Sequence, residues 1–264
     1  MNSHALAVIE FGPALDLVAG HARSSLGAER VRSSTPRADR DWVVREHARV
    51  SAMRTLVTGD SSWHPQQISD IRPSLSRLRV EGAALDAAHL LGVRNLLRSS
   101  RLTAESFRDD KIPAVTVAMF RAETNALLIA RQQEKAIDTA IDDDGGVRDE
   151  ASPALRRTRR ELRGAQGELV KLLERIASRL DPHHQVTDMS VTVRNGRYVI
   201  PVRREARSIV GGIVHDTSST GSTLFVEPPA AVEAGNRIRE LQSDELREID
   251  RILAELTEEV RPIR

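Results

Sequence analysis

The chain contains no cysteine, few aromatic residues and only three lysines. Without cysteine it can form no disulfide scaffold, no zinc knuckle and no thiol nucleophile, and its composition is typical of a reducing cytosol. Aromatic residues make up 3% of the 264 residues, which is low for a β-sandwich or barrel and favours helices. Lys111, Lys135 and Lys171 follow aspartate, glutamate and valine. Because a phosphate loop needs Gly-Lys-Ser/Thr, the chain contains none.

Long apolar runs are also missing. No stretch approaches the length of a membrane span, and residues 1–15 carry an acid and lack the basic start of a signal peptide. We therefore expect a cytoplasmic protein without membrane contact. The 39 basic and 38 acidic residues leave a formal charge of +1, so a nucleic-acid-binding role would have to rest on local clusters of charge.

Residues 1–110 show the apolar spacing of short helices separated by breaks. A helix is expected over about 39–57, because Trp42 and Val50 fall at helical spacings within it. Another is expected over 85–102. This part is expected to be all-α, and no residue pattern in it indicates chemistry.

Two long helices are expected in the second half of the chain. The first begins with Ser152 as N-cap and Pro153 as its first residue, and the second follows Pro228-Pro229. The apolar residues of the first step by three and four, as in a coiled coil: Leu155, Thr158, Leu162, Ala165, Leu169, Leu172 and Ile176.

These two helices carry opposite charge. The first has an arginine run at 156–163, and the second is rich in acid between 240 and 255. Matching seams and opposite charge predict an antiparallel pair, and two unrelated core helices are the alternative. The acidic helix accounts for only part of the arginine run, so nucleic acid is a candidate partner for the rest.

The β signal lies between the two helices. Residues 189–194 and 197–202 flank Asn195-Gly196, the strongest short turn signal for a hairpin. A two-residue turn fixes the register, so Val193 should face Tyr198 on an apolar side of the hairpin.

Further strands are expected after this hairpin. Residues 209–215 and 223–226 are candidates for the third and fourth strands, joined by the polar turn 216–222. Pro201 suggests that its strand lies at an edge of the sheet. The insertion is therefore predicted to form a small antiparallel sheet of three or four strands.

The polar side of the hairpin carries arginine. Like charges placed opposite each other destabilise a hairpin unless an anion lies over them, and the register sets Arg194 opposite Arg197. Tyr198, the only tyrosine, points to the other side, so no aromatic residue is expected among the arginines to stack on a base. The pattern favours phosphate contacts that do not read sequence, and arginines that only keep an exposed hairpin soluble are the alternative. The candidate nucleic-acid-binding residues are Arg194, Arg197, Arg203, Arg204 and Arg207.

Three other groups of residues resemble sites only superficially. His215, Asp216 and the serines that follow have the composition of a hydrolytic triad, but such close neighbours are more simply a turn. His183-His184 lacks a carboxylate at ligand spacing, so these are interpreted as loop histidines. The stretch 141–149 approaches a calcium-loop pattern, but alanines fall at the first and last ligand positions. We therefore predict no catalytic residue and no metal site.

Several stretches resemble the bacterial MutS homologues of the second type. The longest is VTVRNGRYVIPVRREARSIVGGIVHDTSSTGSTLFVEP, from Val191 to Pro228. Shorter matches follow the same order along the chain: ALAVIEFGPAL near the start, ISDIRPSLSRL (Ile68 to Leu78) and DGGVRDEASP (Asp144 to Pro153). The chain therefore resembles the N-terminal core, lever and clamp region of this family.

The resemblance implies a mainly α fold with a helical core at 1–110, antiparallel lever helices at 111–182 and 229–264, and a small antiparallel β clamp at 183–228. In longer members these parts precede a MutS-type ATPase, which binds ATP and magnesium, and usually a small Smr nuclease domain. Such proteins are dimers. Since this chain lacks a phosphate loop, we expect no cofactor in it, and we interpret it as a fragment or a product without its ATPase.

The resemblance also implies a partner. Members of the family are associated with branched DNA and restraint of homologous recombination, and with collided ribosomes, where the same basic tip would touch ribosomal RNA. We therefore expect a nucleic-acid-binding lever and clamp module that contacts DNA, branched or duplex, or the ribosome. A coiled-coil adaptor that binds protein partners without nucleic acid is the alternative.

Overall fold

The computed structural model describes residues 3–59 and 63–264, and the described chain is mainly helical with one small antiparallel sheet, as the sequence predicts. It divides into two compact units, which we describe separately. The helical unit comprises residues 1–148 and 253–264, and the sheet unit comprises residues 149–252. The finer division into core, lever and clamp stays a prediction. Within the described ranges, no helix has the length and apolar character needed to cross a membrane.

The helical unit contains the expected short helices. Helix α4 (Arg40–Thr58) begins after Asp39, whose carboxylate accepts a hydrogen bond from the Trp42 amide at 3.0 Å. Helix α6 (Ala87–Ser106) begins in the same way after Asp86. Both helices agree with the predicted spans to within a few residues. The others are α1 (Ser3–Val8), α2 (Phe11–Ala19), α3 (Ser25–Arg32), α5 (Arg72–Leu78), α7 (Ala114–Met119), α8 (Arg121–Asn125) and α9 (Arg131–Ala140).

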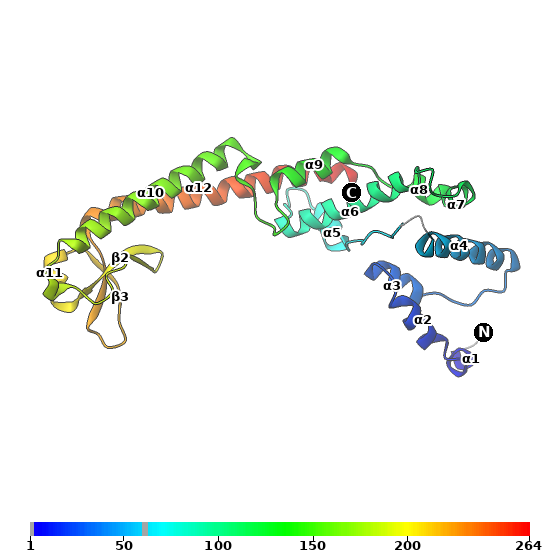
Figure 1. The fold of residues 1–264 in the computed structure, drawn as a ribbon, viewed down its shortest axis with the longest axis horizontal. Helices are drawn as coiled ribbons and strands as arrows, with labels where there is room; N and C mark the ends of the chain where they lie inside the picture. Colours follow the sequence, from blue (N-terminus) through cyan, green and yellow to red (C-terminus); the bar gives the residue numbers. More distant parts are fainter. Residues whose placement is uncertain (1–2, 60–62) are drawn as a thin grey trace. The chain divides into compact units, whose positions relative to one another are not determined.

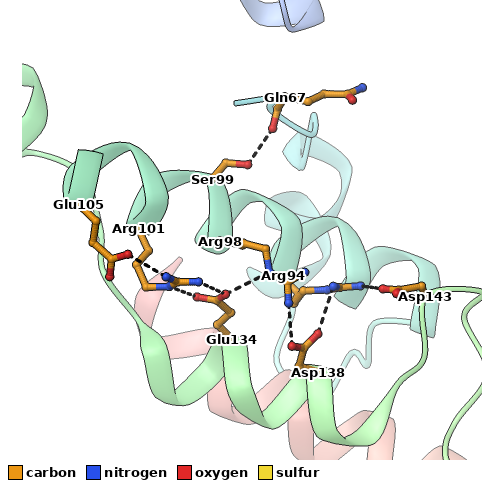
Figure 2. A network of polar contacts seen from close by, with 9 residues as sticks. All are labelled: Gln67, Arg94, Arg98, Ser99, Arg101, Glu105, Glu134, Asp138 and Asp143. Atoms are coloured by element: carbon orange, nitrogen blue, oxygen red, sulfur yellow. Dashed lines mark hydrogen bonds and ion pairs between the residues drawn. The ribbon is translucent and has the colours of Figure 1, made fainter. Parts of the chain in front are cut away.

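A network of arginines and acids joins α6 to α9 (Figure 2). Arg101 donates two hydrogen bonds of 2.8 Å to the Glu134 carboxylate, and these hold the pKa of Glu134 below its ordinary value. Arg94, only 4% exposed, pairs with Asp138 at 3.1 Å and with Asp143 at 2.7 Å. Because loss of one member would leave a poorly hydrated charge, the network fixes how the two helices pack.

The end of α12 also belongs to the helical unit. The Leu85 amide donates to the hydroxyl of the buried Thr257 at 2.9 Å. The Arg261 guanidinium donates to the carbonyl oxygens of Leu78 and Val80. Arg261 lies in η4 (Arg261–Ile263), a short 3-10 helix after α12. These bonds attach the last residues of the chain to the segment between α5 and α6.

In the sheet unit, α10 (Pro153–Ser178) and α12 (Pro229–Val260) form the predicted antiparallel pair (Figure 1). Ser152 caps α10: its hydroxyl accepts from the Leu155 amide at 2.9 Å and donates to Glu248 of α12 at 2.6 Å. Farther along α10, Glu161 meets Arg237 at 3.4 Å. Later residues of α10 thus meet earlier residues of α12, as an antiparallel arrangement requires.

The sheet has the strand order β1-β2-β4-β3 and is antiparallel throughout. Its strands are β1 (Thr192–Arg194), β2 (Arg197–Arg203), β3 (Ile213–Thr217) and β4 (Thr223–Glu227). Asn195 and Gly196 have φ values of 50° and 72°, the left-handed pair that a tight type I′ hairpin needs. The predicted register is confirmed within β1, because Val193 pairs with Tyr198 and Arg194 with Arg197. The strand is shorter than the predicted 189–194, since β1 begins only at Thr192.

One face of the sheet packs on the helix pair. Leu169 and Leu173 of α10 share a buried apolar cluster with Ile200 of β2 and Ile238 of α12. Tyr198 packs against this cluster, so it lies on the apolar side as predicted. Apolar burial between the sheet and the two helices therefore holds the sheet unit together.

The predictions for the third strand and for Pro201 are wrong. The sequence predicts the third strand over 209–215, but residues 209 and 210 belong to α11 (Arg207–Val210), which follows η3 (Arg204–Ala206), and β3 extends from Ile213 to Thr217. Gly211 ends the helical segment with a positive φ of 66°, which glycine adopts without steric strain. Nor is Pro201 on an edge strand, since β2 lies between β1 and β4. However, β1 pairs with β2 only as far as Val199, so no strand lies beside Pro201 on that side of β2. Proline has no N–H to donate and is tolerated at such an open position.

Candidate nucleic-acid interface

Of the arginines predicted to bind nucleic acid, three lie on the strands β1 and β2 and two in the helical segment that follows β2. Arg194 and Arg197 are paired across β1 and β2, and Arg203 follows on β2 with the same alternation, so all three share the sheet face opposite the apolar cluster, which we call the arginine face. Arg204 begins η3 and Arg207 begins α11. The segment with Arg204 and Arg207 packs on the apolar cluster through Ala206 and Val210, so the five residues have different surroundings.

Arg197 belongs to a largely buried ion pair. Its Nη1 lies 3.2 Å from Oε1 of Glu227, and the two side chains are 16% and 2% exposed. The other Glu227 oxygen lies 2.7 Å from Nε2 of His215. A Cβ on Gly235 of α12 would stand 2.9 Å from the same Oε1 and 3.1 Å from Nη1 of Arg197, so the helix lies against the pair and an alanine there would require these side chains to shift. The anion that two facing arginines require is thus supplied by the chain itself.

Arg194 is also compensated within the chain. Its guanidinium lies 4.4 Å from the centre of the Phe225 ring, and its Nε lies 3.3 Å from Asp216, so a cation–π contact and an ion pair act together. Phe225 pairs with Pro201 and therefore lies on the arginine face. The prediction that this face has no aromatic residue is wrong. The alternation of residues 223–227 is the sequence signal that would have placed Phe225 there.

The remaining three arginines are exposed. Arg203 donates from Nε to the Gln185 carbonyl at 2.9 Å, and Arg204 from Nε to the Gly221 carbonyl at 2.8 Å. No ion pair is found for these two within the described chain, so their Nη groups keep donors for an external anion. Arg207 makes no side-chain hydrogen bond or ion pair with another described residue. We call Arg203, Arg204 and Arg207 the exposed arginine cluster.

Two adjoining cavities open on the arginine face. The larger, about 540 Å³, is lined by Arg194, Pro201 and Phe225 among others, and the smaller, about 290 Å³, is lined by Arg203 and Glu205 among others. They share the side chains of Val186, Thr187 and Thr223. The side chains that line these two cavities carry both signs of charge. A preference for phosphate therefore rests on the exposed arginine cluster rather than on the cavities.

Asp216 and Ser218, which resemble part of a hydrolytic triad in the sequence, make hydrogen bonds within their own turn. Asp216 accepts from the Thr217 amide at 2.8 Å, and the Ser218 hydroxyl accepts from the Thr223 amide at 3.1 Å, so these side chains organise the turn as predicted. His183-His184 lies in η2 (Pro182–His184). In the described part of the chain, no group of three or more histidines or acids could hold a metal ion.

The arginine run of α10 is only partly neutralised. Arg159 donates to Asp149 and to Glu245 of α12, both at 2.7 Å. Burial lowers the pKa of Arg159, but these two hydrogen bonds outweigh it and leave the pKa raised. Arg163 is 3.4 Å from the same aspartate, and Arg160 is exposed with no side-chain partner among the described residues. The acidic helix therefore accounts for Arg159 and leaves positive charge on the outer side of α10.

Comparison with known proteins gives several relatives that carry the same name. No family model matches the chain. A protein named Endonuclease MutS2 from Gemmatimonas aurantiaca is 54% identical over 262 residues, which cover 99% of this chain and 32% of that protein. Proteins of the same name from Pelotomaculum thermopropionicum and a Geobacillus species are 37% and 36% identical, and each match covers 97% of this chain and about a third of the relative (32% and 33%).

The antiparallel helix pair with its small sheet, together with similarity over nearly the whole chain, defines a MutS-type protein. The chain belongs to the bacterial MutS homologues of the second type, and it spans about a third of the length of the curated relatives it matches.

Proposed function

We propose that this chain is a nucleic-acid-binding lever and clamp module of a dimeric MutS-type ATPase. The observation that carries the proposal is the exposed arginine cluster at the end of β2 and in the turns after it, where the described structure provides no carboxylate partner. Exposed guanidinium groups without an internal anion favour phosphate. Arg194 and Arg197 have a lesser part, since Asp216 and Glu227 already neutralise them.

The wider function of the whole protein follows from the family. We propose a cytoplasmic dimer whose ATPase domain binds ATP and magnesium, and whose relatives' name, Endonuclease MutS2, suggests a nuclease activity elsewhere in the protein. Its substrates would be branched or duplex DNA, in the suppression of homologous recombination, or the RNA of collided ribosomes. In this proposal the chain itself contributes binding and no catalytic residue.

The proposal is tested by salt-titrated binding of the 264-residue chain to duplex DNA, branched DNA and structured RNA. Each phosphate contact contributes about 0.9 to the slope of log K against log salt for duplex DNA. We expect the triple variant Arg203→Gln, Arg204→Gln, Arg207→Gln to lower the slope by up to about 2.7.

The matched control removes three exposed arginines elsewhere, with Arg45→Gln, Arg54→Gln and Arg247→Gln, and should leave the slope unchanged. Equal losses in both variants would mean that binding follows total charge, and the clamp assignment would be wrong. If the wild-type chain binds none of the three nucleic acids, the adaptor alternative replaces the proposal.

A further inference from the structure

The side of α10 turned away from α12 carries a second row of basic residues. Successive residues of a helix are rotated by about 100°, so one row runs opposite to the buried seam of Leu155, Leu162 and Leu169. Every member of that row is exposed: Arg160, Gly164, Gly167 and Lys171. Further exposed basic residues flank it: Arg156, Arg157, Arg163 and Arg175. We call this surface the α10 ridge.

The ridge keeps its positive charge. Arg160 and Lys171 form no ion pair with a described residue, and the flanking pairs are between exposed groups, as with Arg163 and Asp149 at 3.4 Å. Such exposed pairs contribute little and are readily exchanged for another anion. Of the glutamates in this stretch, Glu168 and Glu174 lie beside the row, each three residues from Lys171, and Glu161 is rotated farther to one side, where it pairs with Arg157 at 3.8 Å. The six basic residues of the ridge still outnumber these three glutamates.

Two glycines at the centre of the ridge have no explanation within the chain. A glycine in the exposed interior of a helix destabilises it relative to alanine. A Cβ on Gly164 or Gly167 would meet nothing within 4 Å, whereas one on Gly235 would stand 2.9 Å from Glu227. Internal packing therefore favours glycine at position 235 and gives no reason for the two ridge glycines. A partner that approaches the helix backbone closely would account for them.

We propose that the α10 ridge contacts the sugar-phosphate backbone of duplex DNA, with the glycines letting the helix enter the major groove. This surface is separate from the exposed arginine cluster, although the inference rests on the proposed nucleic-acid role of the chain. The major groove of B-DNA, about 12 Å wide, admits a helix. The deep, narrow groove of double-stranded RNA does not, which is why duplex DNA is the assigned partner.

Two variants of the 264-residue chain test this inference on a duplex DNA of random sequence. The first, Arg160→Gln with Lys171→Gln, should lower the salt slope by about 1.8 and the affinity near 0.1 M salt by roughly tenfold per lost contact. Its matched control is Arg239→Gln with Arg247→Gln on α12, which removes the same charge and should change neither value.

The second variant, Gly164→Ala with Gly167→Ala, separates folding from contact. It should raise the melting midpoint, because alanine favours the helix and no Cβ contact is strained, and yet weaken DNA binding by about tenfold, the equivalent of one lost phosphate contact. A raised midpoint with unchanged affinity would overturn the inference.

The remaining outcomes are also decisive. Equal loss in the α12 control, or an equal loss of affinity for double-stranded RNA, would overturn the assignment to duplex DNA. If the triple variant of the exposed arginine cluster loses affinity and the ridge variants do not, the ridge inference fails while the proposed function stands. If only the ridge variants lose affinity, the ridge inference stands and the clamp assignment fails.

Discussion

The buried pair of Arg197 and Glu227 gives the sharpest test of how the sheet unit is held together. The alternation of the hairpin predicts that Arg194 and Arg197 are equivalent surface residues, so that either could be replaced without loss of stability. In the structure Arg197→Gln removes a partner from a carboxylate that is 2% exposed. Breaking such a pair usually costs about 3–5 kcal/mol. Because His215 still bonds Glu227 at 2.7 Å, we expect a loss at or below the bottom of this range, about 2–3 kcal/mol.

The assay uses the only tyrosine of the chain. Tyr198 packs in the sheet unit, while Trp42 and Trp63 belong to the helical unit, so a fluorinated tyrosine followed by ¹⁹F NMR reports urea unfolding of the sheet unit alone. This matters because two units need not unfold as one transition. With m of about 1–3 kcal/mol/M, a loss of about 2–3 kcal/mol should move the urea midpoint by roughly 0.7–3 M.

Two further variants make the test decisive. Arg194→Gln should lower stability by less than about 1 kcal/mol, since its side chain is 39% exposed and its pair with Asp216 is partly hydrated. The double variant Arg197→Gln, Glu227→Gln should be more stable than Arg197→Gln alone, because no buried charge remains unpaired. Equal midpoints for Arg194→Gln and Arg197→Gln would refute the argument that burial distinguishes the two arginines.

Three more outcomes are expected. Leu169→Asp places a charge at a seam position that is 2% exposed and should destabilise the sheet unit by several kcal/mol, about 3 or more, and an unchanged ¹⁹F midpoint would place this residue on the surface. The hydrogen bonds from Arg251 and Ser152 lower the pKa of Glu248 from 4.5 to about 2. Because this pKa is lower in the folded state, the ionised carboxylate stabilises the fold above pH 4.5, and this contribution is lost as the pH falls toward 2. Glu248→Gln should therefore flatten the pH dependence of the unfolding midpoint in this window. The pure chain should neither bind nor hydrolyse ATP, since it has no phosphate loop, and magnesium-dependent turnover that persists through repeated purification would contradict this.

Local patterns in the sequence determined the elements of this fold. Ser152 before Pro153 marked the start of α10 to the residue, because capping chemistry acts within one helical turn. Asn195-Gly196 determined both the hairpin and its register, because a two-residue turn leaves no freedom in pairing. The spacing of leucines and the opposite charges of the two helices determined their antiparallel pairing, since each seam can be buried only against another apolar seam.

Tertiary structure alone decided which arginines can meet a partner. Arg194 and Arg197 look identical to Arg203 in the sequence, and only the pairing of β2 with β4 brings Phe225 and Glu227 beneath them. The strand order likewise put β2 inside the sheet, which Pro201 alone did not indicate. Contacts between residues some thirty positions apart depend on which strands become neighbours, and no local propensity encodes that choice. The charge that remains for nucleic acid is therefore a property of the folded surface and not of the arginine pattern.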